Sequence, residues 1–337
     1  PSILYAAALV WATVQLFPVP GLVHPLWSSA GDALDAPVQG AVSLVPGDTV
    51  EGIARLVAYA AVFWLSLQAG RSGAVAERVF ATVAVAAGVY VLYGLITTLP
   101  GMSWLAVYER TVGGRFSGPF VSANNFATFV GIGVVTATAV LYEGFRGAAR
   151  GVETAKERRR LKVEYLANRG WPFVATWVLC VSGLLLSQSR AGFLATTVAL
   201  AAFFPLLALS QRHNRGSAWA AAGFSAAAML VFVILSGGQL LDRLDPQTVS
   251  DQSQGRAAVY DITMTAIADA PLEGFGVGSF QEVFRIYQPP DLPGVWAMAH
   301  NTYLENALEL GIPAAAALTL AVAWLAGRCL VGTFQRR

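Results

Sequence analysis

His300 lies where a long polar segment gives way to an apolar one, and its side chain has the chemistry of a general base. Asn301 follows it, and Glu305 and Glu309 come further along the same apolar segment. Imidazole is the side chain best suited to moving protons near neutral pH. At a helix N-terminus the helix dipole disfavours the imidazolium and keeps a neutral base available. The alternative is that His300 only packs against or caps the helix, as a lone histidine more often does.

The two glutamates differ in what they could reach. Asn301 and Glu305 share one face of the expected helix, so we expect Glu305 to reach a polar site at its outer end. Acids buried in a membrane helix are costly unless they have partners. Glu309 could instead be an ordinary packing acid partnered by an arginine.

Three arginines have surroundings that suit anion binding. Arg115 lies just before an apolar segment, nine residues ahead of Asn124; Arg190 lies in a tight Ser-Gln-Ser-Arg turn between two apolar segments; Arg256 precedes Tyr260 by four residues. The planar guanidinium binds phosphate oxygens in pairs and stays charged. No Asp or Glu lies within several residues of Arg190 in the sequence, and a cation held at a membrane boundary is usually functional. The alternative is that these arginines are solvated or paired with acids.

Two other arginines are expected to pair with neighbouring acids. Arg243 lies between Asp242 and Asp245, and Arg285 lies three residues after Glu282. Such surface pairs contribute little energy and indicate no site.

The composition predicts an all-α polytopic membrane protein. Hydrophobic residues make up 55% of the 337 residues and charged residues 12%, with a mean hydropathy of +0.56, whereas soluble proteins carry about 25% charged residues. Apolar runs of about 18 or more residues indicate membrane spans. The chain begins with Pro1 and not Met, so we expect upstream helices to be missing from this fragment. About eight spans are expected, near 3–22, 53–69, 79–98, 125–142, 173–188, 191–210, 219–236 and 302–326.

Basic residues predict the orientation of these spans. The loops on one side, with the C-terminal tail, hold 15 Lys and Arg, and the loops on the other side hold 6. By the positive-inside rule the first set faces the cytoplasm. We therefore expect membrane helices over 1–236 with a cytoplasmic basic loop at 143–172, an extracytoplasmic loop over 237–300, and a last span with a cytoplasmic tail over 301–337.

The extracytoplasmic loop is expected to contain an amphipathic helix over 253–267, with Ser253 as its N-cap. Arg256 and Tyr260 then share one face of this helix. The later Gly-Phe-Gly-Val-Gly run, 274–278, superficially resembles a dinucleotide-binding motif, but it does not follow a buried strand. We interpret its glycines as a tight turn.

Several classes of site are not indicated by the sequence. Cys180 and Cys329 belong to no CxxC pair, so neither a disulfide nor a zinc site is expected. There is no HExxH motif, no P-loop and no acidic cluster suited to Mg²⁺. The Arg-rich stretch 146–169 is interpreted as a cytoplasmic loop near anionic lipid headgroups and not as a nucleic-acid site. No metal, cofactor or nucleic acid is predicted.

A set of short motifs in order along the chain resembles a known family. The motifs are Arg-Phe-Ser-Gly-Pro-Phe-Val-Ser-Ala-Asn-Asn-Phe-Ala, Ser-Gln-Ser-Arg-Ala-Gly, a Gly-Arg pair in the loop helix, Gly-Phe-Gly-Val-Gly-Ser-Phe, and His-Asn followed by Gly-Ile-Pro. Together they span about 110 to 313 and resemble the O-antigen ligase and polymerase superfamily of bacterial inner-membrane glycosyltransferases. The chain departs from that pattern at Ala314, where members often have a second Gly. It also has fewer helices than the usual dozen or so.

The resemblance implies an activity and a set of residues that perform it. His300 would be the catalytic base, and Arg190, Arg256 and Arg115 would bind the substrate. Beside the residues that the resemblance implies, Asn301, Glu305, Asn124 and Tyr260 are further substrate-binding candidates. The donor would be a glycan on polyprenyl pyrophosphate at the outer face of the bacterial inner membrane. Inverting transfer to an acceptor hydroxyl would then need neither a metal nor a nucleotide.

Two questions stay open from the sequence. A transporter or flippase for a lipid-linked or anionic substrate would also use outer-face arginines, although inverted repeats with broken helices are not visible. The acceptor is equally open, because lipid A-core, a second lipid-linked glycan or a protein hydroxyl fits the same chemistry. These acceptors distinguish a ligase, a polymerase and an oligosaccharyltransferase.

Overall fold

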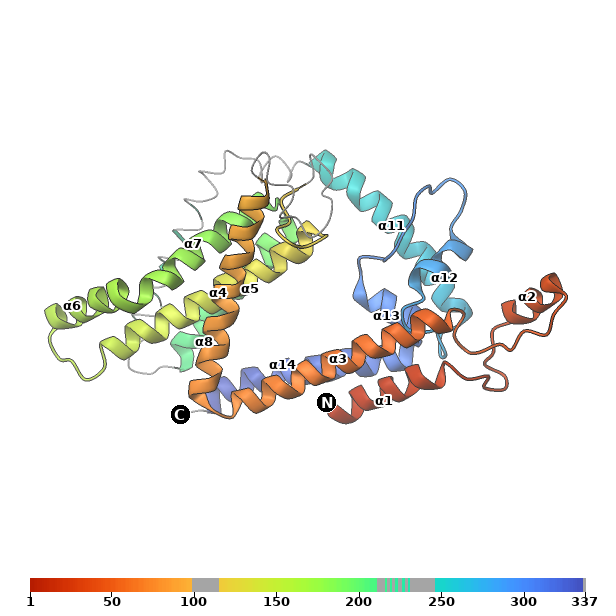
Figure 1. Ribbon diagram of the computed structural model, residues 1–337, viewed down its shortest axis with the longest axis horizontal. Helices are drawn as coiled ribbons and strands as arrows, with labels where there is room; N and C mark the ends of the chain where they lie inside the picture. Colours follow the sequence, from red (N-terminus) through yellow and green to blue (C-terminus); the bar gives the residue numbers. More distant parts are fainter. Residues whose placement is uncertain are drawn as a thin grey trace. The chain divides into compact units, whose positions relative to one another are not determined.

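The fold is entirely helical over the residues that the structure describes. This computed structural model describes residues 1–98, 115–210 and 246–335, with a few single residues between 216 and 230. Every regular element in these ranges is a helix (Figure 1), so the predicted all-α class is confirmed. The elements are α1 (Ser2–Val14), α2 (Leu26–Leu34), α3 (Pro46–Gly70), α4 (Gly73–Thr98), α5 (Ala123–Ala148), α6 (Ala155–Tyr165), the π-helical turn η2 (Leu166–Gly170), α7 (Trp171–Leu186), α8 (Arg190–Ser210), α11 (Pro246–Asp269), α12 (Phe280–Tyr287), α13 (Thr302–Leu310) and α14 (Ile312–Gln335).

Six helices in the described ranges are long and apolar enough to cross a membrane. Five of them overlap spans predicted between residues 53 and 210, and the sixth lies near the C-terminus. The predicted span 219–236 falls largely outside the described residues. The chain is therefore a polytopic helical membrane protein. The six helices are Pro46–Gly70, Gly73–Thr98, Ala123–Ala148, Ala155–Leu186, Arg190–Leu209 and Ile312–Gln335.

The first predicted span, 3–22, is wrong in extent. Helix α1 ends at Val14, and Pro18 and Pro20 follow, which cannot continue a helix because they lack the backbone N–H.

The last predicted span, 302–326, is also wrong in extent, because the structure divides it into α13 and α14 at Gly311 and the long apolar helix is Ile312–Gln335. This glycine has a φ of 77° and a ψ of 158°, a conformation that side chains disfavour. Pro313, the second residue of α14, fits the first turn of a new helix. The Ile312 N–H donates to Pro271 O at 2.8 Å, so the loop that contains Pro271 holds the start of α14 in place.

The chain forms two compact units. One contains Pro1–Ser66 with Gln247–Arg336, and the other contains Leu67–Pro246. We refer to them as the terminal unit and the central unit. The predicted division at 236 and 300 follows membrane sides and not packing, and it stays a prediction.

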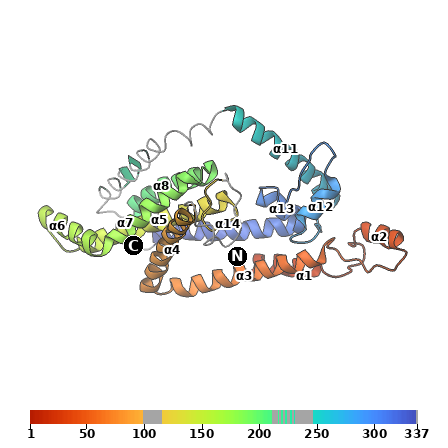
Figure 2. The same cartoon turned by 45° about the horizontal axis from the view of Figure 1, so that its top comes forward.

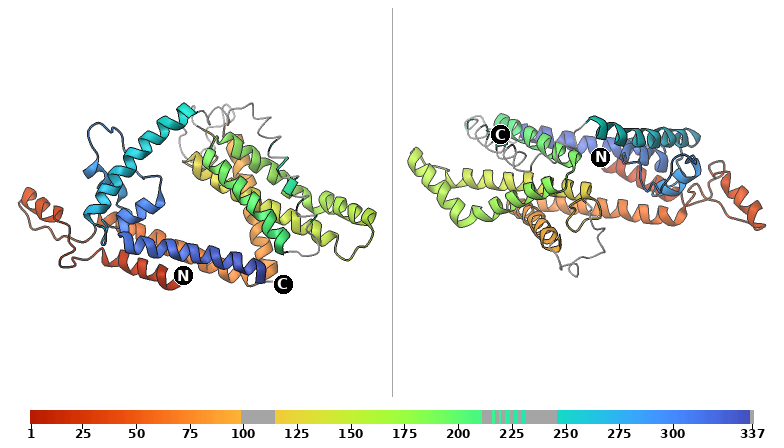
Figure 3. Two further views of the ribbon diagram at one scale, coloured as in Figure 1. Left: turned by 180° about the vertical axis from the view of Figure 1, so that it is seen from behind. Right: turned by 90° about the horizontal axis from the view of Figure 1, so that it is seen from above.

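The central unit is a bundle of α4, α5, α7 and α8 (Figure 3). Small residues allow the helices to approach closely, as expected in membrane proteins. Gly133 of α5, for example, faces Ala87 and the Sγ of Cys180. One interhelical hydrogen bond joins the Trp177 indole N–H to Thr138 Oγ1 at 3.1 Å.

The terminal unit joins both ends of the chain. Helix α1 packs against α14, and the Tyr5 hydroxyl donates to Leu56 O of α3 at 2.6 Å. Helices α11, α12 and α13 gather near the start of α14 (Figure 2). They bury a second core that includes Val259, Phe284 and Leu308.

Candidate functional site

His300 lies in the loop between α12 and α13, directly before the N-cap of α13, and its side chain is exposed. Its φ is 57°, a left-handed conformation that is uncommon outside glycine. The predicted position at a helix start is confirmed, although the helix is the short α13 and not a membrane span.

Two side chains hold the backbone around His300. Asn301 is the N-cap of α13, and its Oδ1 accepts from the N–H groups of Tyr303 at 3.1 Å and Leu304 at 3.4 Å. The Glu305 carboxylate accepts from the N–H of His300 at 3.1 Å. Both groups therefore satisfy free N–H groups at the helix start, as capping side chains do. We refer to Asn301 and Glu305 as the His300 latch.

Glu309 lies one turn beyond Glu305 and caps the preceding helix, α12. Its Oε1 accepts from the N–H of Phe280, the first residue of α12, at 3.3 Å. Burial of the carboxyl raises the pKa of Glu309 to about 7. The N–H groups of Gly278 and Phe280 act against this rise in pKa, Glu305 adds to it, and Arg55 opposes it.

Arg55 of α3 was not among the residues proposed for the site from the sequence. Its guanidinium acts electrostatically on Glu309, and its Nη2 lies 3.1 Å from where a Cβ on Gly278 would stand. The hypothesis that an arginine partners Glu309 is thus supported by Arg55, which lies far from Glu309 in the sequence. The only sequence feature that could have indicated Arg55 is its positive charge near the start of an apolar segment.

The glycine run 274–278 forms a tight turn, as predicted, and it supports the end of α13. Gly274, Gly276 and Gly278 have φ values of 67°, 106° and 88°. The N–H of Gly276 donates to Glu309 O at 2.8 Å. Buried Gln15 of α1 donates to the same carbonyl at 2.8 Å, so α1 and the turn both fix the position of Glu309.

Arg256 and Tyr260 lie on α11, which is longer than predicted. The helix begins at Pro246, so Ser253 lies inside it and is not its N-cap. Arg256 is exposed and Tyr260 is half-buried. Thr263, one turn further along the same side of α11, is fully buried. This side of the helix is therefore exposed at Arg256 and buried at Thr263.

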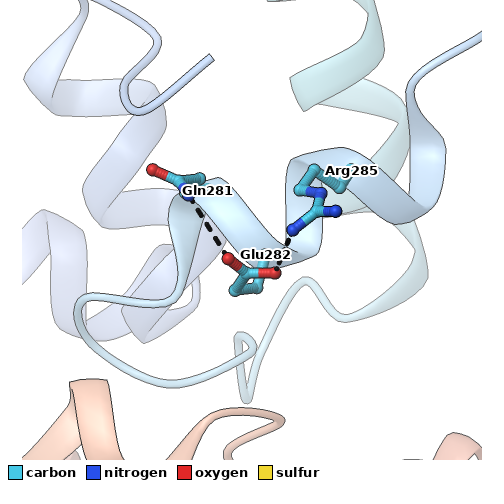
Figure 4. Close-up of polar contacts among 3 residues, drawn as sticks. All are labelled: Gln281, Glu282 and Arg285. Atoms are coloured by element: carbon cyan, nitrogen blue, oxygen red, sulfur yellow. Dashed lines mark hydrogen bonds and ion pairs between the residues drawn. The ribbon is translucent and has the colours of Figure 1, made fainter. Parts of the chain in front are cut away.

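Arg285 forms the predicted surface pair. Its Nη1 lies 3.1 Å from Glu282 Oε2, and the Gln281 amide also donates to Glu282, at 3.3 Å (Figure 4). Both side chains of the ion pair are well exposed, so this pair contributes little to stability. Arg243 lies outside the described residues.

The central unit holds the other candidates. Arg115 is exposed, and its Nη1 is 3.5 Å from Asn124 Oδ1, so the structure brings these two predicted residues together. Arg190 is half-buried and is the first residue of α8. The preceding Ser189 hydroxyl accepts from the N–H of Gly192 at 3.2 Å, which caps the helix beside Arg190.

The candidates thus form one set in each unit. Arg115, Asn124 and Arg190 belong to the central unit, and the remaining candidates belong to the terminal unit. Among the residues that the structure describes, no group of three or more His, Cys, Asp or Glu could hold a metal ion.

One family model matches a part of the chain. Residues 175–319 match the model of the O-antigen ligase family. This segment of the chain is similar to the O-antigen ligase family. The resemblance stated from the sequence is therefore confirmed. No curated protein and no solved structure matches the chain significantly.

The O-antigen ligase match covers most of the candidates. Arg190, Arg256 and the segment from His300 to Glu309 lie inside 175–319. Arg55 and Arg115 lie outside it. The similarity of this segment to the O-antigen ligases supports a ligase or polymerase role in glycosyl transfer at a membrane.

Proposed function

We propose that the protein is a metal-independent inverting glycosyltransferase that moves a glycan from polyprenyl pyrophosphate to an acceptor hydroxyl. The reaction takes place at the outer face of the bacterial inner membrane. The observation that carries this proposal is the exposed His300 held by its latch, within a segment that matches the O-antigen ligases.

In this mechanism His300 removes the proton from the acceptor hydroxyl. The acceptor oxygen attacks the anomeric carbon from the face opposite the pyrophosphate, and a new C–O bond forms. The bond from that carbon to the pyrophosphate oxygen breaks, and its electron pair leaves with the polyprenyl pyrophosphate. The proton stays on the imidazole until it passes to solvent.

The arginines would bind the donor and stabilise its departure. Arg190, Arg256 and Arg115 carry fixed charges that suit pyrophosphate oxygens and the negative charge that grows as the bond breaks. Tyr260, one turn from Arg256, and Asn124, beside Arg115, would add hydrogen bonds. Asn301 and Glu305 are assigned to the latch, in place of the direct substrate contact expected from the sequence, because their oxygens already accept backbone N–H groups.

The identity of the acceptor determines which of three activities the protein has, although the chemistry is the same in each. Lipid A-core makes the protein a ligase, the end of a second lipid-linked glycan makes it a polymerase, and a protein hydroxyl makes it an oligosaccharyltransferase. Cells lacking the protein distinguish the first two. Short unpolymerised units indicate a polymerase, and long chains that never reach the surface lipid indicate a ligase.

Transfer from purified lipid-linked donor in the presence of EDTA tests the proposal. His300→Ala and His300→Gln should both lower the rate about a hundred- to ten-thousand-fold, the usual effect of removing a general base. Thermal unfolding of the variants should match the wild type, because the side chain is exposed. A near-normal rate for His300→Gln would assign the proton transfer to another group. Translocation of the donor across liposomes without a new glycosidic bond would indicate a transporter instead.

A further inference from the structure

A groove lies in the central unit, between the end of α5 and helix α6. Its volume is about 380 Å³, within the ~300–1,000 Å³ typical of small-molecule sites. None of the proposed catalytic or substrate-binding residues lines it. Its lining residues are Phe145, Ala155, Arg158, Arg159, Lys162, Val163 and Leu166.

The walls of the groove are held together by packing. The ring of Phe145 meets Tyr165 edge-on, with the ring centroids 5.5 Å apart. At Gly144 any side chain would overlap the Tyr165 ring, so α5 and α6 approach as closely as a glycine allows. The π-helical turn η2 then joins α6 to α7 without a break. These contacts preform the groove.

The groove has a cationic part with no acidic residue in its lining. Three of its lining residues, Arg158, Arg159 and Lys162, are basic, and none is acidic. None of the three forms an ion pair with any residue that the structure describes. The nearby Glu143 of α5 pairs with Arg146 at 3.0 Å. The three charges therefore remain available to an anion.

The groove also has an apolar part at a membrane helix end. Phe145, Val163 and Leu166 line it, and Val163 is 59% exposed. The continuous helix Ala155–Leu186 has 32 residues, about 48 Å, whereas the hydrocarbon core is about 30 Å thick. The polar α6 end must then extend into the headgroup region, where phosphate and acyl chain meet.

We propose that this groove binds an anionic phospholipid. The phosphate lies among Arg158, Arg159 and Lys162, and the first part of an acyl chain lies along Phe145, Val163 and Leu166. Guanidinium groups suit this role because they bind phosphate oxygens in pairs. The proposal does not depend on glycosyl transfer, since none of these residues belongs to the candidate catalytic set.

Equilibrium binding of phosphatidylglycerol to the purified full chain in detergent tests the proposal, with phosphatidylcholine of the same acyl chains as the neutral comparison. The groove variant carries Arg158→Gln, Arg159→Gln and Lys162→Gln. The control variant carries Lys156→Gln, Arg160→Gln and Arg169→Gln, which removes the same charge from the same helix and η2 but outside the groove lining. A basic residue near an anionic surface contributes about fivefold in binding. The groove variant should therefore bind phosphatidylglycerol at least tenfold more weakly, and the control should change less than about threefold.

A second variant tests the apolar part without changing charge. Val163→Trp fills the groove from an exposed position and should also weaken binding of phosphatidylglycerol. Equal losses in the groove and control variants would mean diffuse attraction by the whole helix and would overturn the proposal. Unchanged binding in the groove variant would do the same, as would displacement of the lipid by millimolar inorganic phosphate.

Discussion

At the scale of single residues, the backbone around His300 explains the neighbouring polar side chains. A non-glycine residue in the left-handed region costs roughly 1–3 kcal/mol and persists only where its surroundings hold it. At His300 the surroundings are Asn301 and Glu305, which together occupy three backbone N–H groups. From the sequence, Glu305 is one of the substrate-binding candidates, whereas its hydrogen bond to the His300 N–H supports a positioning role instead.

A substitution at Glu305 separates these two roles. Glu305→Ala removes the acceptor of the His300 N–H and should lower kcat about ten- to a hundredfold, because small displacements of a catalytic group are costly. Glu305→Gln keeps an acceptor oxygen and should retain most of the rate. Steady-state transfer kinetics check this, with KM little changed in both variants. Equal damage by Ala and Gln with a raised KM would favour a direct substrate contact.

Glu309 gives a pH dependence of stability. Its pKa in the folded protein is raised to about 7 from a reference of 4.5, so the folded state holds a proton that the unfolded state releases. The proton on Glu309 therefore contributes on the order of 3 kcal/mol to the unfolding free energy. This contribution is complete below pH 4.5 and is lost as the pH rises through about 7. Thermal unfolding between pH 5 and 8 should show this loss in the wild type, relative to Glu309→Gln. Parallel curves for the two proteins would contradict the assignment.

At the scale of elements, Gly311 separates α13, which bears the candidate residues Glu305 and Glu309, from α14, which is long and apolar enough to span a membrane. Its φ of 77° lets α13 end, and a side chain there would collide with the carbonyl of Leu272. The Gly-Ile-Pro sequence is a typical helix stop. The apolar character on both sides nevertheless favoured one long span, because hydropathy does not register a change of direction.

Replacing Gly311 should therefore be costly, whereas a matched glycine should be tolerated. Gly311→Ala adds both a collision and a strained φ and should lower the unfolding free energy by about 2 kcal/mol or more. Gly327 lies within α14 with nothing within 4 Å of its Cβ position, and Gly327→Ala should be neutral or stabilise by about 0.5–1 kcal/mol. Melting in detergent compares the two. Equal melting temperatures would mean that the break at Gly311 is not required.

The sequence predicted those features that depend on neighbours along the chain. The helical class, the turn before Arg190, the Arg285–Glu282 pair and the placement of His300 at a helix start all arise from local spacing. The electrostatic effect of Arg55 on Glu309 does not arise from local spacing, because it acts between two segments that are distant in the sequence and meet beside the glycine turn. Long-range contacts of this kind need the packed fold, since no local pattern specifies which apolar faces meet.

At the scale of the whole molecule, the distribution of charge predicts which side of the membrane each segment faces. The excess of basic residues, 15 against 6, predicts that α6 faces the cytoplasm and that α12 lies outside. His300 follows α12 in the same predicted loop, so the orientation also decides where transfer can occur. A donor presented at the outer leaflet requires the α12 side to be extracytoplasmic.

Cysteine labelling of spheroplasts with a membrane-impermeant maleimide measures this orientation. Lys156→Cys on α6 and Glu282→Cys on α12 are placed one at a time in a Cys329→Ser background, since Cys329 is exposed and Cys180 is buried. Position 282 should react in intact spheroplasts, and position 156 should react only after permeabilisation. The background protein without an added cysteine is the control. Labelling at 156 but not at 282 would reverse the topology and, with it, the outer-face site, because His300 would then face the cytoplasm.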